Sequence, residues 1–151
     1  MLLGILVRPL IVAVFAAIGR RDVDRMVGRL APDVHHRFAG DHALGGERHD
    51  REAVRRWFER LFRLYPELTF RVGRVTASGW PWALRITVEW VAAVTPLHGE
   101  PYRNVGAHVI RLDRGRVSHL HAYEDSQAVD RALQAMAAAG IAEAAAAPIT
   151  S

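Results

Sequence analysis

Residues 102–125 read YRNVGAHVIRLDRGRVSHLHAYED, and this stretch contains two strand-like runs joined by a short turn. The turn falls at Asp113-Arg114-Gly115, where a polar cluster ends in the glycine that marks such connections. Tyr102–Leu112 and Arg116–Glu124 lie on either side of it. Because the connection is so short, we expect these two runs to pair as antiparallel neighbours.

Two further runs upstream extend this pattern. Strand character is found in Leu68–Ala77 and in Trp82–Thr95. The connection between them is Ser78-Gly79-Trp80-Pro81, which contains a glycine and a proline. The segment Pro96–Pro101 then leads into the run at Tyr102. Short connections rich in glycine and proline favour antiparallel pairing, so the sequence predicts four antiparallel strands in a row.

The first half of the chain and its end are predicted to be mainly helical. Apolar residues recur at helical spacing after Asp22 and Asp50, each of which is a suitable N-cap. The expected elements are a helix at Val23–Leu30, a strand at Val34–Phe38, a loop at Gly40–Asp50, a helix at Arg51–Tyr65 and a helix from Ser126 onward. No linker divides the chain, so we expect one domain over residues 1–140 and an alanine-rich flexible tail over residues 141–151.

The N-terminal segment Leu10–Ile18 is continuously apolar. It lacks the basic start of a signal peptide, and it is too short for the roughly 20 residues that cross a bilayer. A helix that begins near Pro9, ends at Gly19 and packs against the sheet accounts for it best. A membrane-associated segment remains the alternative.

Composition narrows the classes of function. The 151 residues are 50% hydrophobic and 24% charged, as in an ordinary globular domain. Cysteine and lysine are both absent, which excludes disulfides, a cysteine nucleophile and lysine Schiff-base chemistry. The net charge is +4, and the arginines are spread along the chain rather than gathered as nucleic-acid binding requires. We therefore expect a cytoplasmic protein that binds neither nucleic acid nor membrane.

The order of these elements predicts an α+β fold with helices on one face of a curved antiparallel sheet and a pocket between the layers. This order, together with several short pieces, resembles the nuclear transport factor 2-like superfamily and, within it, the SnoaL-like proteins. The resemblance covers roughly residues 8–136. Its matching pieces are Gly19-Arg20-Arg21-Asp22, Leu30-Ala31-Pro32-Asp33-Val34, Gly45-Gly46-Glu47, Ala53-Val54-Arg55-Arg56-Trp57-Phe58, Tyr65-Pro66-Glu67-Leu68, Tyr102-Arg103-Asn104-Val105-Gly106, Gly115-Arg116-Val117 and Tyr123-Glu124-Asp125-Ser126-Gln127.

This resemblance implies a cone-shaped barrel with three N-terminal helices on the concave face of the sheet and a C-terminal helix. It also implies a homodimer formed through the outer face of the sheet. SnoaL-like cyclases work without a cofactor, and they place their catalytic base at the position that matches Asp125. We expect no cofactor here.

The candidate catalytic residues lie on the last predicted strand. His119, His121, Tyr123 and Asp125 alternate with other residues, so a strand would present all four on one face. We expect Asp125 to be the base, with Tyr123 and His121 as hydrogen-bond donors. Asp125 also precedes a helix, however, and could simply be its N-cap.

Other residues are expected to line the pocket and bind a ligand. Asn104 and His108 share one face of their strand, and the other candidates are Glu89, Trp57 and His119. His119 and His121 form an i, i+2 pair, which is too weak a pattern to indicate a metal site, and we expect none.

These residues favour a cofactor-independent lyase or isomerase that resembles polyketide cyclases and acts on a small hydrophobic carbonyl compound. The alternative is a non-catalytic small-molecule-binding or dimeric interaction module. An activity like that of epoxide hydrolases is a minor alternative, because the Arg-x-Asp of those relatives is missing from Arg85–Trp90.

Overall fold

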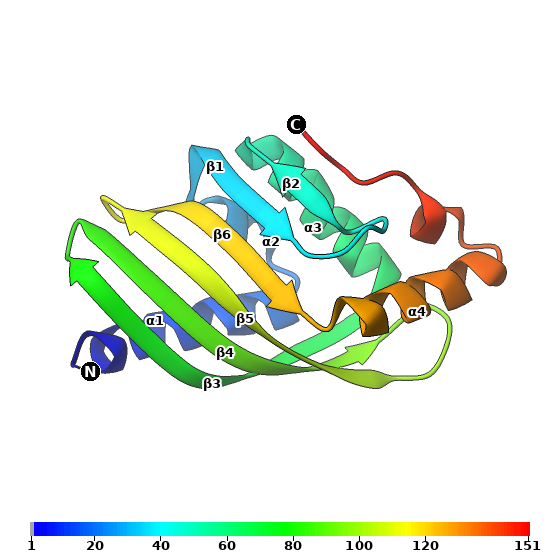
Figure 1. Cartoon of the computed structure of the whole chain (residues 1–151), viewed down its shortest axis with the longest axis horizontal. Coiled ribbons are helices and arrows are strands. Elements are labelled where there is room, and N and C mark those ends of the chain that lie inside the picture. The colour runs from blue at the N-terminus through cyan, green and yellow to red at the C-terminus, as the bar shows by residue number, and fades with distance from the viewer. Residues whose placement is uncertain (1) are drawn as a thin grey trace.

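The computed structural model describes the backbone of residues 2–151 and the side chains from Leu3 onward. It contains four α-helices, one 3₁₀ helix and six strands within these residues (Figure 1). In chain order they are α1 (Leu2–Gly19), α2 (Val23–Val27), β1 (Leu30–Phe38), β2 (Gly46–Arg48), α3 (Arg51–Leu64), β3 (Glu67–Trp80), β4 (Ala83–Thr95), β5 (Tyr102–Asp113), β6 (Arg116–Glu124), α4 (Ser126–Ala138) and η1 (Ala142–Ala145).

The six strands form one curved sheet in the order β2-β1-β6-β5-β4-β3. Strands β3 to β6 pair with their sequence neighbours in antiparallel register, which confirms the predicted meander. On its other edge, β6 pairs with β1, and this pair is parallel. Helices α1, α2 and α3 lie on one side of the sheet, and α4 follows the end of β6 (Figure 1). The predicted α+β fold with helices against a curved sheet is thus confirmed, and the sheet is open, with one parallel pair between β1 and β6.

Helix α3 shows how the sequence builds the helical layer. The Asp50 carboxylate accepts a hydrogen bond of 2.7 Å from the Ala53 amide, so it caps the helix as predicted. One face of α3 is buried and the other carries arginines. Burial of that apolar face against the sheet, rather than helix propensity alone, holds the helix in place.

The N-terminal helix is longer than expected. It begins at Leu2 and includes Pro9, which was predicted to lie at its start. A proline removes one intrahelical hydrogen bond, but the close contact of α1 with β3 compensates. A Cβ at Gly4 would lie only 2.7 Å from the Val75 backbone oxygen, so glycine permits this approach. No helix within residues 2–151 is both long enough and apolar enough to span a membrane.

Several other segments differ from the sequence-based expectation. Helix α2 ends at Val27 and not at Leu30, β1 begins at Leu30 and not at Val34, and β3 continues to Trp80 through most of the predicted Ser78–Pro81 connection. The predicted loop at Gly40–Asp50 contains β2, which is three residues long and pairs with the end of β1. Arginines of β2 and α3 contact the C-terminal tail. Arg60 donates to the Ala147 carbonyl at 2.8 Å, and the buried Arg48 donates to the Ile149 carbonyl at 2.6 Å.

Candidate functional site

A cavity of about 300 Å³ lies between the sheet and the helical layer. Its wall is mostly apolar and includes Phe15, Phe58, Phe70 and Ile110. Several polar side chains also belong to the wall, namely the exposed Arg25 and Arg29 together with His36, Tyr65, Tyr102, Asn104, His108 and Glu124. An apolar cavity with a few convergent polar groups is the usual form of a small-molecule site.

Strand β6 turns alternate residues toward this cavity and away from it. Leu120 and Glu124 belong to the cavity wall. His119, His121 and Tyr123 belong to the opposite, outer face, and Tyr123 is exposed. The predicted alternation is therefore present, but the group expected to face the pocket faces outward, because the apolar residues of the strand take the inner positions.

Asp125 caps the last helix instead of lining the cavity. Its carboxylate accepts a hydrogen bond from the Ala128 amide at 3.1 Å, and its side chain is exposed. Asp125 is thus the N-cap of α4, which was the alternative to its role as a base. The neighbouring carboxyl of Glu124 lines the cavity instead.

The Glu124 carboxyl is the most unusual polar group in the cavity. Both of its oxygens are buried, and neither makes a well-formed hydrogen bond to the described residues, although the backbone amides of Glu124 itself and of Ala39 lie near enough to offset part of the effect of burial. Burial raises its pKa to about 8, and the nearby Asp125 carboxylate adds to this shift. Glu124 is therefore mostly protonated at pH 7, and its proton is exchanged near neutral pH.

His108 faces the cavity from β5 and is held by a neighbouring side chain. The Trp90 indole donates a 2.7 Å hydrogen bond to Nδ1 of His108. Burial lowers the pKa of His108 to about 4, so the ring is neutral and its proton lies on Nε2. Within the described residues the His108 ring makes only the hydrogen bond with Trp90, which leaves its Nε2–H available to a ligand.

Two tyrosines and an asparagine are further polar groups of the wall. The hydroxyl groups of Tyr102 and Tyr65 are 3.3 Å apart, and burial raises the pKa of both, so they stay protonated as donors. Asn104 serves a different purpose. Its amide oxygen accepts from the Asp125 amide at 3.0 Å, and its amide nitrogen donates to the Asp125 carbonyl at 3.4 Å. Asn104 thereby fixes the junction between β6 and α4, beside Glu124.

The remaining predicted site residues divide between the two faces. Trp57 lines the cavity, and its indole donates to the Leu44 carbonyl at 2.7 Å. Glu89 is exposed on the outer face of β4, because its buried neighbours Val88 and Trp90 occupy the inner positions. Of the ligand-binding candidates, Trp57, Asn104 and His108 thus lie at the cavity, whereas Glu89 and His119 do not.

Side chains that could hold a metal ion gather elsewhere. Within the described part of the chain, one group with suitable spacing was found, His35, Glu47 and His49. None of the three belongs to the cavity wall.

A curved sheet with helices on one side and a small apolar cavity between them defines the cone-shaped class of α+β proteins. The sequence profile of the SnoaL-like domain matches residues 11–120, which is more than two thirds of the chain. The protein therefore belongs to the SnoaL-like family, as the resemblance predicted. The search of curated proteins gave no match.

Solved structures with the same fold support this placement. A nuclear transport factor 2-like protein of unknown function from Burkholderia pseudomallei superposes with a TM-score of 0.71 at 25% identity, over 78% of this chain and 89% of that one. A candidate polyketide cyclase from Xanthomonas campestris pv. campestris gives 0.59 at 18% identity, over 80% and 91%. A candidate scytalone dehydratase from Novosphingobium aromaticivorans gives 0.66 at 6% identity, over 78% and 80%. At these low identities the last two show the shared fold.

Proposed function

We propose that the protein binds a small hydrophobic carbonyl compound in the cavity and acts on it as a cofactor-independent lyase or isomerase, with Glu124 as the proton-transferring group. The observation that carries this proposal is the buried carboxyl of Glu124, which has no side-chain partner and belongs to the wall of a mainly apolar cavity. The base expected from the sequence was Asp125, and Glu124 replaces it because of where the two carboxyls lie.

Burial without a partner suits this role. An ionised carboxylate in an apolar wall is poorly stabilised and so binds a proton strongly, which makes it an effective base. The pKa of about 8 means that a minority of molecules carry the ionised form at pH 7 and most do above pH 8. Most general bases operate near their own pKa, so this value fits a reaction near neutral pH.

The chemistry would proceed in two proton transfers. The Glu124 carboxylate takes a proton from the carbon next to the carbonyl, and the electron pair of that C–H bond forms an enolate. The negative charge on the enolate oxygen needs a donor, and the neutral His108 offers its Nε2–H, with the tyrosine hydroxyls as further donors. Glu124 then returns its proton to another carbon or to a leaving oxygen. No oxidant, reductant or cofactor enters this balance.

Cavity size and lining limit the substrate class. A volume of about 300 Å³ is at the lower end of ligand sites, which run from roughly 300 to 1,000 Å³. The aromatic lining includes Trp57, Phe58 and Trp90. A compact molecule with one or two rings suits this space better than a long chain. The candidate polyketide cyclase and the candidate scytalone dehydratase of the same fold are consistent with such a substrate.

The test is hydrogen–deuterium exchange at the carbon next to the carbonyl of 2-tetralone, followed by proton NMR in D₂O. We expect the wild-type protein to accelerate the exchange, with a rate that rises with pH and levels off above about pH 8. Glu124→Gln should lower the protein-catalysed rate by roughly 100-fold or more, the usual contribution of a general base.

Asp125→Asn is the matched control, since it changes the adjacent carboxylate but retains a capping side chain. We expect it to leave the exchange rate within about twofold of wild type. If Glu124→Gln exchanges 2-tetralone as fast as the wild-type protein does, the base assignment fails. Quenching of tryptophan fluorescence by 2-tetralone reports binding independently of exchange.

A non-catalytic binding module is the second candidate, and the apolar lining of the cavity favours it. In that case 2-tetralone would quench the fluorescence of Trp57 and Trp90, but exchange would not exceed the buffer rate. The same two measurements therefore separate an enzyme from a binding protein.

We also propose that the protein is a homodimer that pairs through the outer face of the sheet. Apolar side chains are exposed on that face, with Val105 at 59%, Val109 at 43% and Tyr123 at 46% of their surface. Sedimentation at micromolar concentration tests this, and we expect Val105→Asp to shift the population toward monomer.

A further inference from the structure

Four histidines from three separate segments gather on the outer face of the sheet, near the edge formed by β1 and β2. His35 lies on β1, His49 follows β2, and His119 and His121 lie on β6, which pairs with β1. The His35 ring is 4.6 Å from the ring of His49, 4.5 Å from that of His121 and 5.7 Å from that of His119. Glu47 of β2 reaches the same place.

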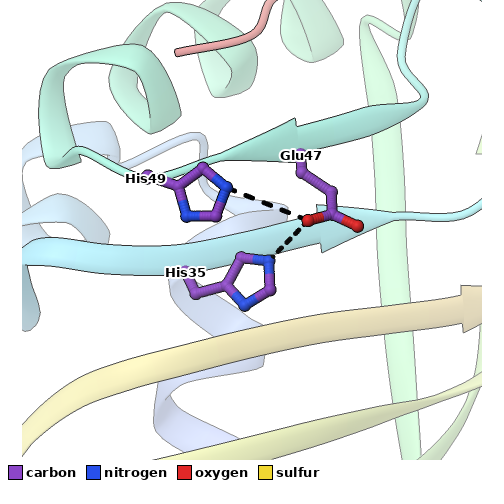
Figure 2. A group of neighbouring side chains, drawn as sticks. All are labelled: His35, Glu47 and His49. Carbon is purple, nitrogen blue, oxygen red and sulfur yellow. Dashed lines mark hydrogen bonds and ion pairs between the residues drawn. The ribbon is translucent and has the colours of Figure 1, made fainter.

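Three of these side chains point their ligand atoms at one another (Figure 2). Nε2 of His35 is 2.8 Å from Oε2 of Glu47, and Nε2 of His49 is 3.9 Å from the same oxygen. One ligand atom from each residue lies within 4.8 Å of the other two. Glu47 and His49 are two residues apart on an extended segment, so both side chains fall on the same side of the strand, above His35.

We propose that His35, Glu47 and His49 form a binding site for a divalent transition-metal ion, with Zn²⁺ as the best match. Two imidazoles and one carboxylate are a ligand set that Zn²⁺ uses, at metal–ligand distances of about 2.0–2.2 Å. Tetrahedral ligands at that distance are separated by roughly 3.4 Å. The distances of 2.8 and 3.9 Å lie on either side of this value, so small rotations of side chains that are partly exposed would complete the site.

His121 supplies the support that metal-bound histidines usually have. Its Nε2 is 3.2 Å from Nδ1 of His35. If Nε2 of His35 binds the metal, its Nδ1–H can donate to His121, which fixes the tautomer and the ring orientation of His35.

The nearby arginines do not occupy the Glu47 oxygen that faces the two histidines. Arg37 contacts the other carboxylate oxygen of Glu47, with its Nε 3.7 Å from Oε1, and Oε2 remains directed at the two histidines. Arg111 is paired with Asp113 at 2.9 Å, which partly offsets its charge near His119. The alternative is a plain surface cluster in which Glu47 pairs with His35 and Arg37, and the experiment distinguishes the two.

The site would lie on the opposite side of the sheet from the cavity, and it would join β1 to the short edge strand β2. Its expected effect is to stabilise this edge. This inference differs from the expectation that the histidines bind no metal, and it does not depend on the proposed enzymatic activity.

Binding can be measured with Co²⁺ and Zn²⁺ on protein that carries no histidine tag and has been treated with a chelator. We expect one equivalent of Co²⁺ per chain to give visible absorption bands typical of a site with protein ligands, and Zn²⁺ to remove them by displacement. Zn²⁺ should also raise the melting temperature, because an ion that binds only the folded state stabilises it.

Variants make the assignment specific. His49→Gln and Glu47→Gln should each abolish the bands and the Zn²⁺-dependent shift in melting temperature, and both positions are exposed enough for the variants to fold. His121→Gln should keep the stoichiometry of one but weaken binding by about 10-fold, as loss of a supporting hydrogen bond does.

His98→Gln is the matched control, because His98 is an exposed histidine in the loop between β4 and β5. We expect it to bind like the wild-type protein. Absence of stoichiometric binding, or equal binding by wild type, His49→Gln and Glu47→Gln, would overturn the proposal and leave a surface ion-pair cluster. Circular dichroism confirms that each variant is folded before titration.

Discussion

The inner and outer faces of β5 and β6 place similar side chains in opposite surroundings. On the inner face, His108 and Glu124 border an apolar cavity, and burial shifts both toward their neutral forms. On the outer face, His121 and Asp113 have hydrogen-bond partners and are near other charged groups. Adjacent residues on one strand therefore differ in chemistry because of the face they occupy, and not because of residue type.

Glu124 and Asp125 show this contrast most sharply. Their carboxyl groups are one residue apart. The first has no side-chain partner and is mostly protonated at pH 7, whereas the second accepts a hydrogen bond from a helix amide at the surface. A carboxyl that caps the start of a helix already accepts a hydrogen bond from the backbone of that helix. A carboxyl without a partner in a cavity retains its capacity to exchange a proton with a ligand.

The largest expected effect comes from adding a carboxylate on each face of β6. Ala122 is buried at 2% exposure, and Tyr123 is exposed at 46%. Ala122→Glu forces an unpaired charge into the core, and we expect it to lower the free energy of unfolding by about 4 kcal/mol. Tyr123→Glu should change it by less than about 1 kcal/mol. Urea denaturation measures both, and similar losses in the two variants would contradict the assignment of faces.

The next effect concerns the pH dependence of stability. The pKa of Glu124 is raised from 4.5 to about 8 in the folded chain. Between these values the unfolded chain releases a proton that the folded chain keeps, so rising pH favours unfolding. Below pH 4.5 and above pH 8 the Glu124 carboxyl has the same protonation in both states, so it adds no pH dependence there. At about 1.36 kcal/mol per unit the shift amounts to roughly 5 kcal/mol. Because water in the cavity can solvate part of the charge, we expect the free energy of unfolding to fall by about half of this amount.

The comparison of wild type with Glu124→Gln isolates this contribution. The variant carries no proton to lose, so its stability relative to wild type should rise between pH 5 and pH 8.5. Other titrating groups, such as His36 and His108, are common to both proteins and cancel in the difference. A difference that stays constant over this range would show that Glu124 ionises as an ordinary surface carboxyl does.

A smaller effect is expected at Asp125. Asp125→Ala removes the acceptor for the Ala128 amide at the start of α4, which should lower the free energy of unfolding by about 1 kcal/mol. Asp125→Asn retains a capping oxygen and should lose less than half as much. Thermal or urea unfolding provides the measurement. Neither change should affect exchange of 2-tetralone, and a rate loss above 10-fold in Asp125→Asn would return the base to Asp125.

Much of the fold could be predicted from local patterns. The strand boundaries of β6 and the cap at Asp50 follow from turn residues and hydrophobic spacing, which act over a few residues. The short strand β2 could not be predicted in this way, because it exists through pairing with β1 and not through its own sequence. The start of α1 was misjudged because the rule that places proline in a first turn outweighed the apolar residues before it.

The site was predicted less well than the fold, although the sequence did contain a signal for Glu124. Leu120 and Ala122 are apolar, and Glu124 continues their alternation, so a carboxyl in phase with these two residues was visible in the sequence. The histidine cluster had no such local signal. It depends on the parallel pairing of β1 with β6 and on the register of β2, which bring together residues more than 80 positions apart.

The smallest expected effect is at Glu89, which tests the inner and outer faces on a second strand. Glu89 was expected to bind ligand, and the structure places it on the exposed face of β4, opposite Ala107 in the register. Glu89→Gln should therefore change the free energy of unfolding by less than about 0.5 kcal/mol and leave exchange of 2-tetralone unchanged. Its neighbour Trp90 faces inward and donates to His108, so Trp90→Phe should reduce exchange by releasing that ring. If Glu89→Gln lowered exchange more than Trp90→Phe did, the reacting molecule would lie on the outer face and not in the cavity.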